Sequence, residues 1–575
     1  MDRSFQTSLA STLRALGPLG DRLWQALAIG LFVALSALAL VAYVEPARLE
    51  RWSSTRFGRL LGSERLFVGL MLLTIGILRL PGSCQLELNY DESGSILGAR
   101  TLLGDPRFWL SFENTTLGPV HTYSVALVGL LGFDINYSTT KLLGVAVCMA
   151  TWAALYFAFR QRYAAELARL FAVPVGFVFA HFTFFDYVAY NGEHMPMLLL
   201  ALSYLLYAKL ETRSGRATAL CLGLGFLLGL VPYAKIQAAP IAVAFGLFVC
   251  AQSAWRRDGR YLLCVLGALL PSLALIVNLS LTGALRDFWE SYVLNNLLYA
   301  SEGHRGHQRE QSLFDNALHY HSYLRSPADT RSFFTFSLLL GAVSASLLLW
   351  RRVLGGLFGA AELILGWVLF AVASFAVLLP KNNWSHYLVL LIVPVAILLA
   401  ASLQVLLELA RQGELRMRLT PGWFSVGFLA IFVLPSLLNV VRFGNPAIRN
   451  AAQHWQEGSS RTPIVRLLER FVKPGQAVAL WGGNMRALVE VGARLGTRDA
   501  HIERQVEASR QRDYYLSRWL YDVEVNRPPV LVDSTPGDRS YVGEGLETQP
   551  KLQLLFRSYA LAESGAGVNV YLRRQ

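Results

Sequence analysis

The sequence has 575 residues, of which 54% are hydrophobic and only 16% are charged. Soluble globular domains usually carry about 25% charged residues, so this composition excludes an ordinary soluble protein. The net charge of +13 would suggest nucleic-acid binding in a soluble protein. In a membrane protein it is explained by Lys and Arg in cytoplasmic loops, so no nucleic-acid partner is expected.

Apolar runs recur along the chain and predict an α-helical polytopic membrane protein with about twelve transmembrane helices. The longer runs reach the ~20 residues needed to cross a hydrocarbon core of about 30 Å. Clear examples lie at residues 23–44, 67–80, 143–159, 262–281, 363–379 and 387–407. The first is long for a signal-peptide core, so it is expected to be retained. The five cysteines show no spacing typical of a disulfide or zinc site and are interpreted as small apolar residues.

Basic residues gather in every second loop, which predicts that these loops face the cytoplasm. The clusters are Arg48, Arg51, Arg56, Arg59 and Arg65; Arg160, Arg162 and Arg169; Lys209, Arg213 and Arg216; Arg256, Arg257 and Arg260; Arg351 and Arg352; and Arg411, Arg416 and Arg418. The alternate loops are then expected outside, at residues 84–141, 181–194, 232–235, 282–331 and 380–386. The N-terminal residues 1–22 would also lie outside, although they carry Arg3, Arg14 and Arg22.

Two domains are predicted: a transmembrane domain at residues 1–444 and a small extracytoplasmic α/β domain at residues 445–575. In the second, strand-like runs at 477–481 and 530–532 alternate with helical patterns at 486–495 and 514–525. In the first outer loop, the apolar stretch 120–133 is too short to span comfortably and is expected to form an interfacial helix.

The first candidate for chemistry is the adjacent pair Asp91 and Glu92, early in the first outer loop. A partly desolvated carboxylate is a good general base, so this pair could perform acid/base work near a membrane surface. An acidic pair is also common at the start of a helix, so spacing alone leaves a structural role open.

Glu193 and His194 form the second candidate, at the entrance of a helix, where a Glu is also favoured by the helix dipole. The third is Lys235, followed by Gln237, in a very short turn between two apolar runs. Ionisable residues at membrane depth usually need a partner, and a lysine at headgroup depth can pair with a lipid phosphate. Snorkelling of Lys235 toward water is the structural alternative.

The fourth candidate lies at residues 380–387, where Lys381 and His386 could face a phosphate or a sugar. Trp384 and Tyr387 in the same turn could equally be aromatic residues of the membrane interface. All four candidates fall in loops assigned to the same side. A substrate site at the outer lipid–water boundary is therefore expected.

At these residues the chain resembles the glycosyltransferase C superfamily, and within it the bacterial group related to protein O-mannosyltransferases and aminoarabinose transferases. The order of the motifs and their shared side carry the resemblance. The motifs are Asp91-Glu92, Gly98-Ala99-Arg100, Gly118-Pro119-Val120-His121-Thr122-Tyr123, Gly229-Leu230 with Lys235, Tyr387-Leu388 with Pro394, Asn526-Arg527-Pro528-Pro529-Val530-Leu531-Val532-Asp533, and Tyr571-Leu572-Arg573-Arg574.

The chain departs from that group at three places. Leu117-Gly118 stands where aminoarabinose transferases have a lysine before a Pro pair, and Glu193-His194 stands where many relatives have Asp. The helix at residues 23–44 is additional. The first two departures concern the regions from which donor and acceptor identity would be inferred.

The resemblance implies an inverting transferase of the bacterial inner membrane that moves a sugar from a polyprenyl phosphate to an acceptor hydroxyl on a glycan, lipid or protein. Asp91 would be the general base, and Glu92 would position Asp91 or the sugar. Lys235, with His386 as a second choice, would neutralise the departing phosphate. The sequence requires no cofactor, although a divalent metal is compatible with it.

Three other functions stay open from the sequence. A polysaccharide ligase or polymerase would use outer Arg and His residues, which the loop 282–331 offers at His304, Arg305, His307, Arg309, His319 and His321. A lipid-linked glycan transporter or flippase would place polar residues on broken helices at the bilayer midplane, within repeated halves. A structural membrane protein with a partner-binding outer domain is the third.

Overall fold

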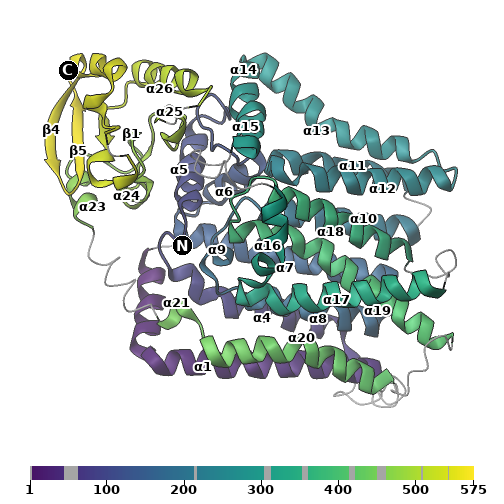
Figure 1. Cartoon of the computed structure of the whole chain (residues 1–575). Helices are drawn as coiled ribbons and strands as arrows, with labels where there is room; N and C mark the ends of the chain where they lie inside the picture. The colour runs from purple at the N-terminus through teal and green to yellow at the C-terminus, as the bar shows by residue number, and fades with distance from the viewer. Residues whose placement is uncertain are drawn as a thin grey trace.

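The computed structural model describes residues 3–44, 62–212, 217–302, 313–351, 360–412, 421–449, 462–506, 509–541 and 543–575. Most of the chain forms a bundle of long apolar helices, and the C-terminal part forms a separate α/β domain at one end of that bundle (Figure 1).

Ten helices in the described ranges are long and apolar enough to cross a membrane. They are α1 (Arg3–Val44), α4 (Glu64–Arg79), α7 (Tyr137–Arg162), α11 (Ala217–Ala234), α12 (Ala239–Trp255), α13 (Tyr261–Thr282), α17 (Ala328–Arg351), α18 (Ala360–Leu378), α19 (Ile392–Arg411) and α20 (Pro421–Phe443). Two further apolar helices, α8 (Ala165–Ala180) and α10 (His194–Thr212), pack among them. The chain is a multi-pass integral membrane protein, and the expected dozen helices correspond to the ten candidate spans and these two helices.

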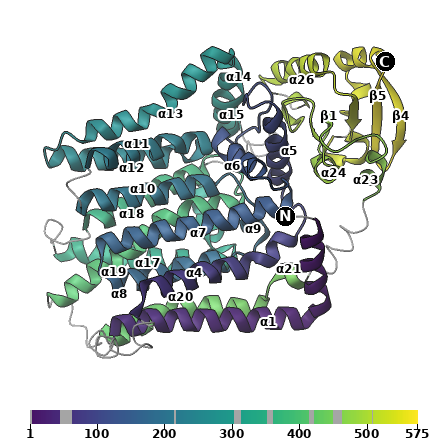
Figure 2. The ribbon, with the colours of Figure 1, turned by 180° about the vertical axis from the view of Figure 1, so that it is seen from behind.

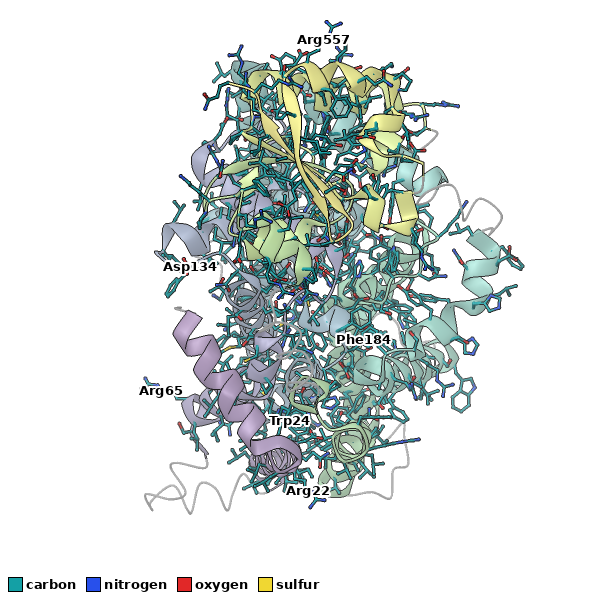
Figure 3. The ribbon with its side chains drawn as sticks, turned by 90° about the vertical axis from the view of Figure 1, so that its left-hand side faces the viewer. Arg22, Trp24, Arg65, Asp134, Phe184 and Arg557 are labelled. Carbon is teal, nitrogen blue, oxygen red and sulfur yellow. The ribbon has the colours of Figure 1, made fainter. Side chains whose placement is uncertain are left out.

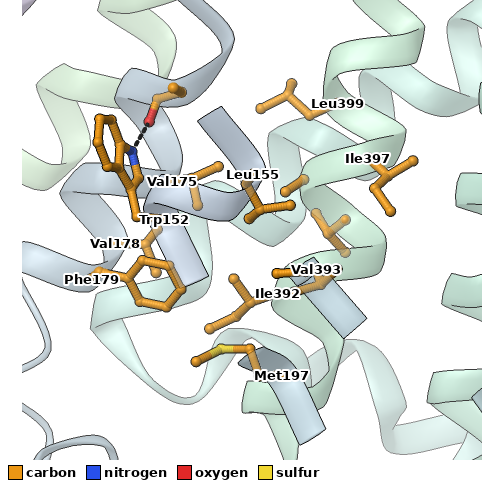
Figure 4. Packing of buried hydrophobic residues seen from close by; sticks show 14 of the residues in the cluster. Trp152, Leu155, Val175, Val178, Phe179, Met197, Ile392, Val393, Ile397 and Leu399 are labelled. Atoms are coloured by element: carbon orange, nitrogen blue, oxygen red, sulfur yellow. Dashed lines mark hydrogen bonds between the residues drawn. The ribbon is translucent and has the colours of Figure 1, made fainter. Parts of the chain in front are cut away.

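The bundle core is built around α19, which is apolar on every side and buried along nearly its whole length. A helix that is apolar all round is typical of the centre of a bundle. Figure 4 shows Ile392, Val393 and Leu399 of α19 on the side toward α7 and α8, whereas Ile397 points the other way. Nearby, the Trp152 indole donates to the Ala172 carbonyl at 2.9 Å, so its polar group is satisfied within the core.

Helix α1 lies along α20 and α8, at the edge of the bundle (Figure 2). The Trp24 indole donates to the Leu78 carbonyl at 3.1 Å, and the Asp21 carboxylate accepts from the Asn445 amide at 2.8 Å. Residue 21 therefore lies beside the end of α20 from which the chain leads to the C-terminal domain. This places the first part of α1 at the domain end of the bundle.

Short elements that join the long helices gather at the domain end. They are η1 (Leu80–Cys84), α5 (Tyr90–Gly104), α6 (Pro119–Leu130), α9 (Phe185–Val188), η2 (Ile236–Ala238), α14 (Leu285–Phe288), the π-helical turn η3 (Trp289–Leu294), α15 (Asn295–Glu302), α16 (Leu313–Arg325), η4 (Ser385–Leu391) and α21 (Pro446–Arg449). The stretch 120–133 is helical as expected, since α6 covers most of it. All five cysteines are free thiols.

The C-terminal domain contains a five-stranded mixed sheet with the order β2-β1-β3-β5-β4, in which β1 pairs in parallel with β2 and β3. Its elements are α23 (Pro463–Leu468), β1 (Ala477–Trp481), α24 (Met485–Glu490), β2 (Arg494–Leu495), α25 (Glu503–Val506), α26 (Arg512–Asn526), β3 (Val530–Asp533), η5 (Thr535–Gly537), η6 (Arg539–Tyr541), η7 (Leu546–Thr548), η8 (Pro550–Arg557), β4 (Tyr559–Gly565) and β5 (Val568–Arg573). The runs 477–481 and 530–532 are strands as predicted.

The predicted helix at 486–495 is correct only in its first half. Helix α24 ends at Glu490, and Arg494–Leu495 is a parallel edge strand beside β1. Gly492 lies between the two elements and has a φ of +77°. Glycine adopts this left-handed conformation without strain, and it commonly ends a helix.

The domain rests on the first loop, and the two share one apolar core. Ile96, Leu97 and Leu102 of α5 pack in the same buried cluster as Val478 and Leu488 of the domain. Figure 3 looks onto the domain, with its sheet lying over the end of the bundle and Arg557 at its rim.

Candidate functional site

The four predicted polar segments lie together at the domain end of the bundle. Asn89, just before α5, donates from Nδ2 to the Asn191 side chain at 2.7 Å and lies 3.4 Å from Asp186 Oδ1. Asp186 Oδ2 is in turn 3.5 Å from Nδ1 of His386. The first, second and fourth candidate segments are therefore linked by direct polar contacts.

Asp91 lies in the first turn of α5, which Asn89 caps by accepting from the Glu92 amide at 3.3 Å. Asp91 is half-buried, and its carboxylate makes no hydrogen bond or ion pair with any other residue that the structure describes. Its charge nevertheless acts on a neighbouring hydroxyl. Burial raises the pKa of Tyr299, and Lys235 opposes this rise while Asp91 adds to it. Asp91 and Lys235 therefore act on the same hydroxyl with opposite sign.

Glu92, the other member of the pair, is fully buried and engaged. Its Oε1 lies 3.0 Å from Nζ of Lys141, and its Oε2 accepts from the Leu88 amide at 2.8 Å. Lys141 also donates to the carbonyls of Gln85 and Leu86, at 3.2 and 2.9 Å. This arrangement fixes the segment that leads into α5 and leaves Glu92 no open side toward a substrate.

Lys235 forms a buried ion pair with Glu193, which joins the second and third candidate segments. The Lys235 ammonium also lies 4.9 Å from the centre of the Tyr387 ring. Burial disfavours the charge of Glu193, but Lys235 and His386 outweigh it and lower the pKa of Glu193 to about 2. Lys235, the predicted phosphate ligand, thus already has a carboxylate partner, with an aromatic face beside it.

Close backbone approach holds Lys235 in place. Leu117 forms a bridge with Lys235, and the Gly118 amide donates to the Ala234 carbonyl at 3.1 Å. A Cβ at Gly118 would collide with the Tyr233 carbonyl, and a Cβ at Gly192 would collide with the Leu117 side chain. Gly118, which departs from the aminoarabinose-transferase pattern, is therefore explained by the close packing of this segment.

The other predicted residues take different positions. The Gln237 amide donates to the Ala376 carbonyl at 2.9 Å, which ties η2 to the end of α18. Lys381 is half-exposed in a left-handed turn with φ +60°, and its ammonium has no partner within the described part of the chain. The Tyr387 and Tyr299 hydroxyls lie 3.1 Å apart, and Asn382 donates to the latter.

His194 is fully buried, and its Nδ1 lies 3.2 Å from both the amide and the carbonyl of Asn191. A second buried histidine, His121, stacks on Tyr190 with ring centres 4.7 Å apart, and its Nε2 lies 3.1 Å from Ser95 Oγ. Burial lowers the pKa of His121 to about 3, so its ring is neutral at ordinary pH. Both histidines help to hold the polar segments in position.

The sequence did not single out Lys141 or Tyr299. Lys141 could have been identified from the sequence, because a lysine inside a long apolar helix needs a partner. Tyr299 gives no such signal, since aromatic residues are common in outer loops. Of the proposed histidine-rich loop, His304, Arg305, His307 and Arg309 lie outside the described residues.

Two buried arginines of the domain join it to the loops beside the site. Arg498 pairs with Asp522 at 2.8 Å and with Asp287, just before η3, at 2.9 Å. Arg518 pairs with Asp499 and lies 3.1 Å from Glu113 of the first loop. Burial raises the pKa of Asp499 to about 7, with Arg518 opposing and Glu113 adding to the rise.

The acidic residues that could make the domain catalytic have structural partners instead. Asp533, at the end of β3, accepts from the amide and hydroxyl of Thr535 and from the Leu546 amide. Glu490 pairs with Arg486 at 2.7 Å. Across the described ranges, no three His, Cys, Asp or Glu side chains are grouped to hold a metal ion.

The sequence matches no family model and no curated protein. The structure is similar to ArnT from Cupriavidus metallidurans bound to undecaprenyl phosphate, with a TM-score of 0.53, 12% identity, and coverage of 88% of this chain and 98% of that one. The apo state of the same protein gives 0.47, at 12% identity over 88% and 97% of the two chains. The archaeal oligosaccharyltransferase AglB from Archaeoglobus fulgidus gives 0.44, at 14% identity over 89% and 75%. The chain therefore has a glycosyltransferase C-like fold, in which a polytopic helical membrane bundle carries a small α/β domain at its C-terminal end.

Proposed function

We propose that the chain is an inverting membrane glycosyltransferase that moves a sugar from a polyprenyl phosphate to an acceptor hydroxyl. The fold shared with ArnT, whose structure holds undecaprenyl phosphate, supports this class of donor. The site would face the outer side of a bacterial cytoplasmic membrane, as the basic loops at the other end of the bundle suggest. The acceptor would be a glycan, lipid or protein hydroxyl.

The observation that carries the proposal is the contrast between Asp91 and its acidic neighbours. Glu92 and Glu193 each have a lysine partner, and Asp186 accepts from Asn89 and lies beside His386. Asp91 alone among these four is left without a partner in the described structure. A general base needs an available lone pair, and the half-buried Asp91 carboxylate has one.

In the proposed reaction, Asp91 takes the proton of the acceptor hydroxyl as that oxygen attacks the anomeric carbon. The bond between this carbon and the phosphate oxygen breaks, and the phosphate leaves with the electron pair. A single displacement inverts the anomeric carbon. Lys235 would stabilise the negative charge on the leaving phosphate, sharing its ammonium with Glu193. Lys381 and His386 are the further candidates for this role within the same group of loops.

Glu92 takes a positioning role in this mechanism. Its ion pair with Lys141 holds the segment before α5, so it acts on Asp91 through the backbone. Glu92→Gln should therefore be milder than Asp91→Asn.

The test is transfer by the purified protein from radiolabelled polyprenyl-phosphate sugars, with any labelled acceptor identified and with and without a metal chelator. Loss of a general base lowers the rate by roughly 10²–10⁴-fold, so Asp91→Asn should lose at least about 10²-fold. Asp134→Asn is the matched control, because Asp134 is an exposed carboxylate of the same loop (Figure 3). An Asp91→Asn protein that keeps more than about a tenth of the wild-type rate would contradict the base assignment.

A further inference from the structure

The two residues before Asp91 attach the start of α5 to two different parts of the molecule. Asn89 reaches the second loop through Asn191 and Asp186. Tyr90 reaches the C-terminal domain, since its hydroxyl donates to the Gly483 carbonyl and its ring lies 4.9 Å from the His501 ring. Asp91 follows directly, and its carboxylate has no hydrogen bond or ion pair with any residue in the described ranges.

The contact point in the domain is built for close approach. Gly483 is buried just after β1, and a Cβ there would collide with the Tyr90 hydroxyl. The preceding Gly482 has a φ of +113° and packs against Ser534 at the end of β3. The Tyr90 hydroxyl thus meets the backbone just after β1, where Gly482 packs against the end of the parallel strand β3.

His501 completes the contact from the other side of the Tyr90 ring. It is 9% exposed, and its Nδ1 is buried without a hydrogen-bond partner among the described residues. Burial, and after it Tyr541 and Glu503, raise the pKa of Tyr90, so its hydroxyl stays protonated and continues to donate to Gly483. The contact is therefore maintained across the pH range of an assay.

We propose that Tyr90 is a positioning residue through which the C-terminal domain fixes the Asp91 carboxylate for proton transfer. This inference rests on the proposed function. A general base must come within about 2.6–3.2 Å of the proton it takes, and small misplacements of reacting groups lower rates steeply. Because no hydrogen bond or ion pair from a described residue holds the Asp91 carboxylate, the anchored backbone beside it sets that distance.

The experiment compares Tyr90→Phe with Tyr559→Phe in the full-length protein. Tyr559 is the matched control, because its hydroxyl also donates to a backbone carbonyl, that of Pro528 at 2.7 Å, but inside the domain and away from α5. Tyr90→Phe should lower kcat by about tenfold, the loss expected for one hydrogen bond, with the KM for the donor changed by less than about twofold. Gly483→Ala adds a methyl group that displaces Tyr90. It should likewise lower kcat and leave the KM for the donor nearly unchanged.

Hydrogen exchange of the amides of residues 90–94 gives a readout that does not depend on activity. It should be faster in Tyr90→Phe and unchanged in Tyr559→Phe. The proposal would be overturned if Tyr90→Phe kept the wild-type kcat. It would also be overturned if Tyr90→Phe and Tyr559→Phe lost kcat to the same extent. If the wild-type protein transfers no sugar, the proposed function fails, and the exchange of residues 90–94 still decides whether Tyr90 anchors the start of α5.

Discussion

At the residue scale, the buried charges of the site occur as opposite pairs. Glu92 with Lys141, and Glu193 with Lys235, are each almost fully removed from solvent. A single buried charge is very unfavourable, whereas a hydrogen-bonded pair is tolerated. Asp91 needs no such partner because it is half-buried, which leaves it available for chemistry.

Removal of one member of the Glu92–Lys141 pair should destabilise the protein strongly. Lys141→Met leaves Glu92 buried without a cation, and breaking a buried pair in this way costs about 3–5 kcal/mol. The double variant Glu92→Gln with Lys141→Met should recover part of that loss. Thermal unfolding in detergent checks both. Arg107→Met, which breaks an exposed pair with Asp105, should change the Tm little. A Lys141→Met protein as stable as Arg107→Met would show that the pair is not needed.

The Lys235–Glu193 pair predicts a defined pH dependence. The pKa of Glu193 is lowered from 4.5 to about 2, so the stability that this pair contributes is present above about pH 4.5 and is lost as the pH falls toward 2. The difference in Tm between the wild type and Glu193→Gln should therefore stay constant from about pH 7 to about pH 5 and shrink toward about pH 3. A difference that disappears already between about pH 7 and about pH 5 would contradict this assignment.

Much of the candidate site could be predicted at this scale, because ionisable residues beside apolar helices are few. Asp91, Glu193 and Lys235 stood out for that reason. The ion pairs of the site could not be predicted, since Lys141 is 49 positions from Glu92, and Lys235 is separated from Glu193 by a whole helical hairpin. Pairing depends on how the helices pack, which one sequence does not show.

At the element scale, the membrane helices were predictable because each contains a long, nearly continuous run of apolar residues. The strands of the C-terminal domain were harder to predict. Strands β1 and β3 are short apolar runs buried on both faces, which are easily recognised. The hairpin of β4 and β5 was missed, because β4 is largely exposed and mixes Glu, Ser and Ala. Its turn at Ala566-Gly567 is formed by two residues with positive φ, a weak signal in a sequence.

Helices α11 and α13 give a prediction at this scale, because their backbones approach through glycines. A Cβ at Gly225 would collide with the Cys264 carbonyl and lie 2.8 Å from the Ala268 amide nitrogen. Small residues permit such close packing of membrane helices. Gly225→Ala should therefore destabilise the protein by about 1–3 kcal/mol in thermal unfolding. Gly69→Ala is the control, since nothing lies within 4 Å of its Cβ position, and it should leave the Tm unchanged or slightly higher. Equal behaviour of the two variants would contradict the packing explanation.

At the scale of the whole molecule, the domain and the loops of the bundle form one unit around the candidate site. Arg498 and Arg518 cross from the domain to Asp287 and Glu113, and a continuous apolar core lies beneath them. Each guanidinium makes several charge-assisted hydrogen bonds, which gives the contact both strength and a fixed geometry. The domain therefore has a defined position over the site, as a positioning role for Tyr90 requires.

The last prediction concerns the orientation of this unit in the membrane. The domain lies at one end of the bundle (Figure 1). Helices α12 and α19 start from η2 and η4 at that end, so their other ends, followed by Arg256 and Arg257 or closed by Arg411, lie away from the domain. Because Lys and Arg are retained in the cytoplasm, the domain and the candidate site should face outward. In a Cys84→Ser background, a cysteine at the exposed Ser558 of the domain should react with an impermeant thiol reagent in cells whose outer envelope has been permeabilised. A cysteine at the exposed Gln412, just after α19, should react only after the inner membrane is opened. The opposite pattern would place Asp91 on the cytoplasmic side, where a donor presented at the outer face could not reach it.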